Sequence, residues 1–118
     1  MIIIVIMTLL NEPFVAVHRQ VPTSRGVDVD EDIRALLEAL WAVGLDTEFS
    51  CQGERGGLAH VCFSNAAHAR RFMAGPGELA LTVGARRAWV DFPSGQIELL
   101  TRYWASSDEW RRRDSVAL

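Results

Sequence analysis

Apolar residues recur along the chain with two different periods. Period-two runs, which are typical of half-buried strands, cover residues 14–20, 45–50, 58–63, 79–83 and 88–92. Helical spacing covers residues 30–43 and 66–73, and Gly75-Pro76-Gly77 ends the second of these segments. The predicted order is therefore strand, helix, strand, strand, helix, strand, strand, followed by one more element.

Both helices have recognisable start signals. Asp30 can cap the first helix, and Ser64 or Asn65 the second. Asp28, Asp30, Glu31 and Asp32 gather where the first helix begins, which favours complementation of the helix dipole over a metal site. The buried face predicted for this helix consists of Ile33, Leu36, Leu37, Leu40 and Trp41. Gly44 is expected to end it.

The last element is ambiguous by pattern. Ile97, Leu100 and Trp104 fit a helix, whereas Ile97, Leu99, Thr101 and Tyr103 fit a strand. We expect the helix, with Ser94 as its cap.

This order predicts an α+β fold of the split β-α-β, ferredoxin-like kind. Its antiparallel sheet carries helices mainly on one face, and an extra helix lies at the C-terminal end. We expect one domain over residues 1–118, with an ordered core at about 12–105, an apolar N-terminal extension at 1–7 and a polar tail at 108–118. The other sheet face, to which Trp89 or Val90 points, is left open and favours a homodimer.

Composition and charge limit the partners. A formal net charge of −3 argues against a broad phosphate-binding surface. All twelve basic residues are arginine, which we interpret as codon usage in a GC-rich bacterial or phage genome. Arg70, Arg71, Arg86 and Arg87 could still contact nucleic acid beside Trp89, but the acidic balance disfavours it.

Localisation follows from the apolar runs and the thiols. The apolar run at residues 1–7 is too short to span a bilayer, and no basic residue precedes it, so we expect neither a signal peptide nor a membrane segment. Two cysteines do not make a disulfide framework. We therefore predict a cytoplasmic protein with reduced thiols.

The sharpest candidate chemistry lies where a predicted strand meets a glycine-rich connection, Cys51-Gln52-Gly53-Glu54-Arg55-Gly56-Gly57. Cys51 could be a nucleophile activated by nearby backbone amides, with His60 as its base and His18 or His68 as other options. The alternative is a small buried cysteine that completes a tight turn. Cys51 and His60 are the predicted catalytic pair. The predicted ligand-binding residues are Thr47, Ser50, Gln52, Gly53, Arg55 and Trp89.

A metal site and a phosphate site are weaker interpretations of the same stretch, the Cys51–Gly57 corner where the strand meets the glycine-rich connection. Cys51, His60 and Cys62 could converge on zinc, but no CxxC or HxxxH spacing is present, and we predict no metal and no cofactor. Arg55 within its glycines could hold a phosphate. No helix follows this loop, however, so the glycines are better explained by turn geometry.

The stretch from Thr47 to Gly53 resembles a T-x-x-S-C-Q-G pattern of small uncharacterised actinobacterial and phage proteins, in which an apolar helix precedes the motif. It is also distantly similar to the turn T-x-S-S-C-S-G-R of the wybutosine-synthesis methyltransferase family. That resemblance matches Thr47, Ser50, Cys51 and Gly53, whereas Gln52 and Glu54 depart from it. It implies methylation of a modified guanine in tRNA with S-adenosylmethionine.

The sequence thus supports two hypotheses at one corner. The first is a small cytoplasmic binding or regulatory domain whose site lies at Cys51–Gly57. The alternative is an enzyme at the same corner, with either a cysteine nucleophile or a methyltransferase relationship.

Overall fold

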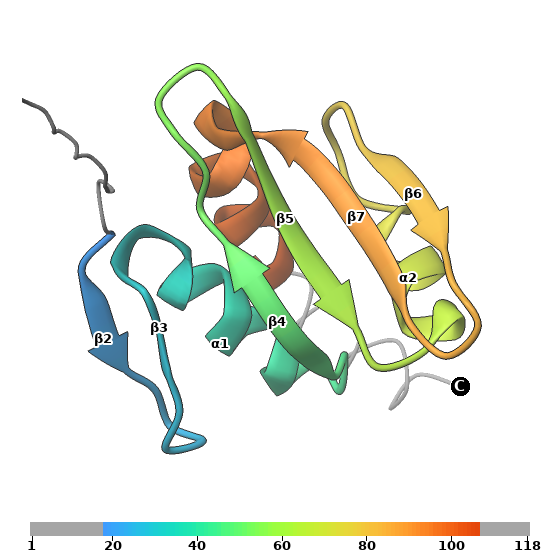
Figure 1. The fold of residues 1–118 in the computed structure, drawn as a ribbon, viewed down its shortest axis with the longest axis horizontal. Helices are drawn as coiled ribbons and strands as arrows, with labels where there is room; N and C mark the ends of the chain where they lie inside the picture. Colours follow the sequence, from blue (N-terminus) through green and yellow to red (C-terminus); the bar gives the residue numbers. More distant parts are fainter. Residues whose placement is uncertain (1–17, 107–118) are drawn as a thin grey trace, which may run out of the picture.

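A computed structural model describes residues 18–106 of the chain, and these form two antiparallel sheets. The small sheet pairs β2 (Gln20–Pro22) with β3 (Asp28–Asp30). The large sheet has four strands in the order β4-β5-β7-β6 (Figure 1). Its members are β4 (Thr47–Cys51), β5 (Leu58–Phe63), β6 (Ala80–Val83) and β7 (Ala88–Pro93).

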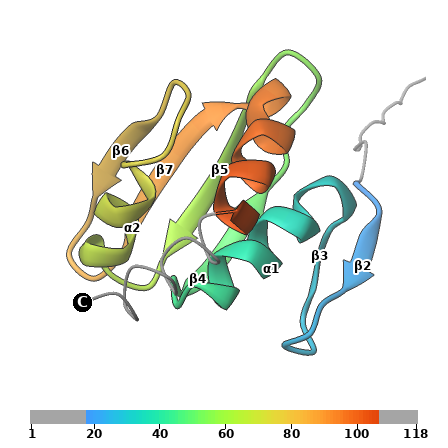
Figure 2. The ribbon, with the colours of Figure 1, turned by 180° about the vertical axis from the view of Figure 1, so that it is seen from behind.

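The helices lie on one face of the large sheet. A 3-10 turn, η1 (Glu31–Ile33), leads into α1 (Arg34–Ala42), and α2 (Ala66–Phe72) follows β5. A second turn, η2 (Ser94–Gln96), leads into a C-terminal helix described over residues 97–106. In Figure 1 the sheet stands in front of the helices, and in Figure 2, seen from behind, the helices cover it. The predicted α+β class, with helices on one face and a C-terminal helix, is confirmed.

The split β-α-β unit is made by β5, α2 and β6. Both strands run antiparallel to β7, so they are parallel to each other with β7 inserted between them. Strand β4 completes the sheet beside β5.

The predicted first strand, residues 14–20, lies mostly outside the described part of the chain, and its last residue belongs to the small sheet. Gln20 begins β2, and its register partner is Asp30 in β3. The hairpin β2–β3 instead lies beyond the β4 edge (Figure 1). Residues 1–17 and 107–118, which include the predicted apolar extension and polar tail, lie outside the described part of the chain.

The core lies between the sheet and the helices. Alternation along β5 buries Ala59, Val61 and Phe63 completely, as period two predicts. Phe72 of α2 sits at the centre of an aromatic cluster, with ring centroids 5.3 Å from Phe63, 6.0 Å from Phe92 and 5.9 Å from Trp104. The same alternation leaves His60 and Trp89 on the face opposite the buried residues of β5 and β7.

The helix ends agree with the sequence in part. Asn65 caps α2 by accepting a hydrogen bond from the backbone amide of His68, and Gly44 ends the α1 segment with φ of 85°. Two predicted caps are wrong. Asp30 makes no capping hydrogen bond, because its carboxylate accepts from Gln52 instead. Ser94 makes none either, because its hydroxyl donates to the Glu54 carbonyl.

No helix among the described residues is long and apolar enough to cross a membrane.

Candidate functional site

The loop from Gln52 to Gly57 joins β4 to β5, and hydrogen bonds hold both of its ends. The Gly57 amide donates to the Glu54 carbonyl at 2.8 Å, which closes the turn. Ser94, where β7 ends, donates its amide to Gly57 at 2.9 Å and its hydroxyl to the Glu54 carbonyl at 2.8 Å. The loop is therefore fixed against the start of the C-terminal helix.

Gly53 is required by this geometry. Its φ is 73°, in the left-handed region that favours glycine. A Cβ placed on it would lie 2.2 Å from the carbonyl oxygen of Leu58, which belongs to backbone and cannot turn aside. The sequence prediction that the glycines serve turn geometry holds at this position.

Gln52 ties the loop to the start of the first helix. Its amide donates to the Asp30 carboxylate at 3.1 Å, and its side-chain oxygen accepts from the backbone amide of Asp32 at 2.8 Å. Its side-chain nitrogen donates to the Asp32 carboxylate at 3.2 Å. These three bonds join parts of the chain about twenty residues apart, and they form one wall of a pocket.

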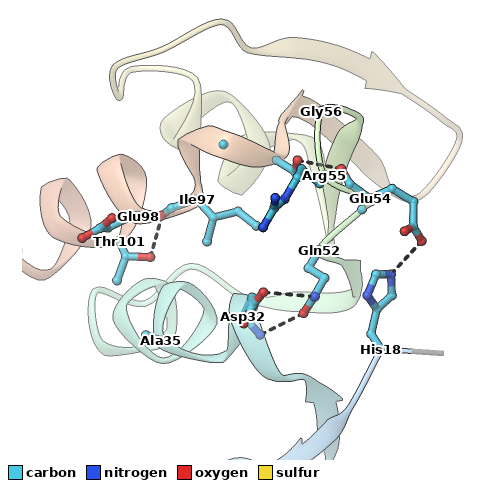
Figure 3. A pocket seen from close by; sticks show the side chains of 13 residues that line it. His18, Asp32, Ala35, Gln52, Glu54, Arg55, Gly56, Ile97, Glu98 and Thr101 are labelled. Carbon is cyan, nitrogen blue, oxygen red and sulfur yellow. Dashed lines mark hydrogen bonds and ion pairs between the residues drawn. The ribbon is translucent and has the colours of Figure 1, made fainter. Parts of the chain in front are cut away.

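The pocket has a volume of about 660 Å³ and lies between this loop, the first helix and the C-terminal helix (Figure 3). The loop contributes Gln52, Gly53, Glu54, Arg55 and Gly56. The facing walls are made by His18, Asp32, Ala35, Ser94, Gly95, Ile97, Glu98 and Thr101. A volume of this size falls within the range of small-molecule sites.

The charged groups around the pocket differ in whether they have partners. Glu54 lies 3.4 Å from Nε2 of His18, and Glu98 lies 3.2 Å from Arg102. Arg55 extends over the pocket toward Ile97 (Figure 3). Within residues 18–106, Arg55 forms neither an ion pair nor a hydrogen bond. Its guanidinium is therefore available to a ligand.

The titratable side chains grouped with Cys51 come from residues distant from it in the sequence. One ligand atom each from His18, Asp30 and Cys51 lies within 4.8 Å of the other two. Asp30 is buried, with 8% of its surface exposed, while His18 and Cys51 are half-buried. In the described part of the chain, this is the group of three such side chains that comes together, and it does not include His60 or Cys62.

The predicted catalytic pair lies side by side in the sheet. Cys51 and His60 are register partners across β4 and β5, and His60 is in turn opposite Asp91 of β7. Partners that face each other in this way project from the same face of the sheet. No hydrogen bond joins Cys51 to His60 among the described residues.

Burial keeps the Cys62 thiol from reacting with a ligand or binding a metal from solution. It has no exposed surface, and burial raises the pKa of its thiol.

The other predicted ligand-binding residues lie apart from the pocket. Thr47 accepts a hydrogen bond from the Trp41 indole at 2.9 Å, and with Ser50 it lines a second hollow beside β3. Trp89 lines a shallow third one with Arg86 and Arg87. Of the predicted set, the structure brings Gln52, Gly53 and Arg55 together.

One of the arginines considered for nucleic-acid binding is already engaged. The Arg87 Nε lies 2.8 Å from Glu48, and its guanidinium lies 5.1 Å from the centre of the Phe49 ring.

Sequence reasoning missed His18 and Asp30 as members of a site. From the sequence, His18 is an alternative base for Cys51, and Asp30 is a helix cap within an acidic run for which a metal site is disfavoured. Their separation from Cys51 along the chain hides the cluster, because the β2–β3 hairpin brings them to it. The sequence carries no signal that separates Asp30, which is buried, from its acidic neighbours Glu31 and Asp32, which are exposed.

Comparisons with known proteins identify no relative: no family model, curated protein or solved structure matches this chain significantly. The resemblance of the Thr47–Gly53 stretch to the methyltransferase turn therefore stays a prediction. The function has to be argued from the site.

Proposed function

We propose that this protein is a small-molecule-binding domain whose ligand occupies the pocket between the Gln52–Gly56 loop and the C-terminal helix. The observation that carries the proposal is Arg55, a guanidinium without a partner among residues 18–106, which extends over a pocket whose loop is held by hydrogen bonds. A pre-formed pocket with a few convergent polar groups is the usual form of such a site.

The walls indicate the chemistry of the ligand. A planar guanidinium binds a carboxylate or a phosphate through two parallel hydrogen bonds. Asp32 and Glu98 offer acceptors on the opposite side, and Ala35 with Ile97 provides an apolar surface. We infer a small polar molecule that carries an anionic group for Arg55 and hydrogen-bond donors or a cation for the carboxylates.

The test is a thermal-shift screen of the full chain against amino acids, dicarboxylates, sugar phosphates and nucleotides. A probe that raises the melting temperature is then titrated by calorimetry against Arg55→Gln and against Arg86→Gln, an exposed arginine outside the pocket. The proposal expects at least a tenfold loss of affinity for R55Q, because one charge-assisted pair is worth about 1.5–3 kcal/mol. It expects no change for R86Q. Equal binding by R55Q and the wild type, or no shift with any probe, contradicts it.

An enzyme at the same corner is the second candidate, and the register of Cys51, His60 and Asp91 across three strands favours it. In this function His60 takes the thiol proton, the Cys51 thiolate bonds to an electrophilic carbon as the leaving group departs from that carbon with its bonding electrons, and Asp91 orients the imidazole. Iodoacetamide is the probe. The proposal expects alkylation of Cys51 at pH 7 much faster than that of free cysteine, and at least tenfold slower in His60→Gln than in His68→Gln. A Cys51 no faster than free cysteine, or unreactive until denaturation, rejects it.

We also propose a homodimer formed through the open sheet face, in a cytoplasmic setting that keeps both thiols reduced. Large apolar side chains on this side support the dimer: Phe49 is 56% and Leu58 63% exposed. Two unpaired cysteines support the setting.

A further inference from the structure

We propose that His18, Asp30 and Cys51 bind one divalent transition-metal ion of the zinc class. The three side chains come from different parts of the chain. His18 lies just before β2, Asp30 ends β3 and Cys51 ends β4. This inference does not rest on Arg55, which carries the proposed ligand pocket, although His18 lines that pocket too.

The geometry is close to that of a zinc site. Zinc–ligand bonds of about 2.0–2.3 Å in a tetrahedral arrangement place neighbouring ligand atoms about 3.4–3.6 Å apart. The three ligand atoms here lie within 4.8 Å of one another, so closure around an ion needs movements of about 1 Å. Changes of side-chain torsion within the half-buried His18 and Cys51 supply displacements of this size.

The electrostatics of Asp30 support a cation at this place. Its carboxylate is buried, and its hydrogen-bond donors, the Gln20 side chain and the Gln52 amide, are both neutral. No basic side chain in residues 18–106 forms an ion pair with it. A buried carboxylate without a positive partner is costly, and a bound dication would provide that partner.

The surroundings also suit the ligands. Glu54 lies 3.4 Å from Nε2 of His18. A carboxylate at one ring nitrogen orients an imidazole whose other nitrogen binds a metal, so Nδ1 of His18 would be the metal ligand. Gln20 and Gln52 hold the Asp30 carboxylate in the same way. A mixed set of thiolate, imidazole and carboxylate favours zinc or cobalt over magnesium or calcium, which prefer oxygen ligands.

Three protein ligands leave one coordination position open, as in zinc sites that bind an exchangeable water. His18 also lines the 660 Å³ pocket, so the metal site lies at the pocket edge.

The experiment is a titration of the full, metal-stripped chain with Co²⁺, followed by optical absorption. The proposal expects one equivalent to bind with a thiolate-to-cobalt charge-transfer band, and one equivalent of Zn²⁺ to abolish that band. Cys51→Ser should lose the band, and His18→Gln and Asp30→Asn should each weaken Co²⁺ binding at least tenfold. His60→Gln, Cys62→Ala and Arg55→Gln are the controls and should bind as the wild type does.

Several outcomes overturn the proposal. They are the absence of a stoichiometric complex, several weak equivalents without a thiolate band, or a band that survives C51S and is lost in C62A or H60Q. Circular dichroism of every variant checks its fold. If D30N is unfolded, H18Q decides the matter alone, because His18 lies outside the hydrophobic core. Unchanged binding by a folded H18Q rejects the site.

Discussion

Gln52 and Asp32 are joined by two hydrogen bonds, one from the Asp32 amide to the Gln52 side-chain oxygen and one from the Gln52 side-chain nitrogen to the Asp32 carboxylate. They lie twenty residues apart in the sequence. This pair holds the loop of the candidate site against the start of the first helix, so the shape of the pocket depends on it.

Gln52→Ala should therefore lower the free energy of unfolding by about 1–2 kcal/mol, since it removes two hydrogen bonds at a partly exposed position. Gln52→Glu should cost more at neutral pH, because a second carboxylate then faces Asp32, and part of this loss should be recovered as the pH falls below about 4. Urea unfolding at pH 7 and at pH 3 measures both. A Q52A variant as stable as the wild type would show that the pair contributes nothing.

Gly53→Ala should destabilise the fold by more than about 2 kcal/mol. It combines a positive φ with a clash against the Leu58 carbonyl. Gly56→Ala in the same loop is the matched control, since it shares a positive φ but has open space around its Cβ. It should cost only about 1 kcal/mol. Equal melting temperatures for the two variants would contradict the steric argument.

The two cysteines should differ in reactivity. Ellman's reagent should label one thiol of the native chain, because Cys51 is half-buried whereas Cys62 is fully buried and its pKa is raised by burial. The second thiol should react only after denaturation. Cys51→Ser should remove the native reaction altogether, and rapid labelling of Cys62 in that variant would be inconsistent with the structure.

Asp46 should contribute to acid sensitivity. Hydrogen bonds from Arg25 and Ser64 hold the pKa of its carboxyl below the ordinary value. Because the folded pKa is the lower one, this stabilisation is complete above the unfolded pKa of about 4 and is lost as the pH falls through the folded pKa. The contribution should stay below about 1 kcal/mol, since the side chain is half-exposed. Asp46→Asn should make the free energy of unfolding, measured with urea, depend less on pH between pH 5 and pH 2. An unchanged dependence would show that other groups cause the acid sensitivity.

The open sheet face should mediate self-association. Sedimentation velocity of the wild type should show a dimer at micromolar concentration, and Phe49→Glu should convert it to a monomer by placing charge in the apolar contact. Leu99→Glu is the control, because Leu99 is 42% exposed and belongs to the C-terminal helix, which lies on the other face of the large sheet. A wild type that is monomeric at all concentrations excludes this interface.

The local pattern of the sequence was sufficient for most elements of the fold. Alternation over residues 58–63 and 88–92 predicted strands whose inward residues, such as Val61 and Val90, are indeed fully buried. The helical interpretation of residues 97–104 was also correct, because Ile97, Leu100 and Trp104 are the buried positions. Such patterns are readable because burial on one face repeats with the period of the element itself.

Only the tertiary structure decided which side chains lie next to Cys51. Sequence proximity pointed to His60 and Cys62 on the next strand, whereas His18 and Asp30 come to Cys51 through the packing of the β2–β3 hairpin beside β4. The described end of the strand predicted at residues 14–20 shows the same effect, since Gln20 pairs with Asp30 and not with the large sheet. Periodicity specifies which side of an element is buried, but it does not specify which distant element covers its edge. That choice depends on contacts such as those of Gln52 with Asp30 and Asp32, which exist only once the chain has folded.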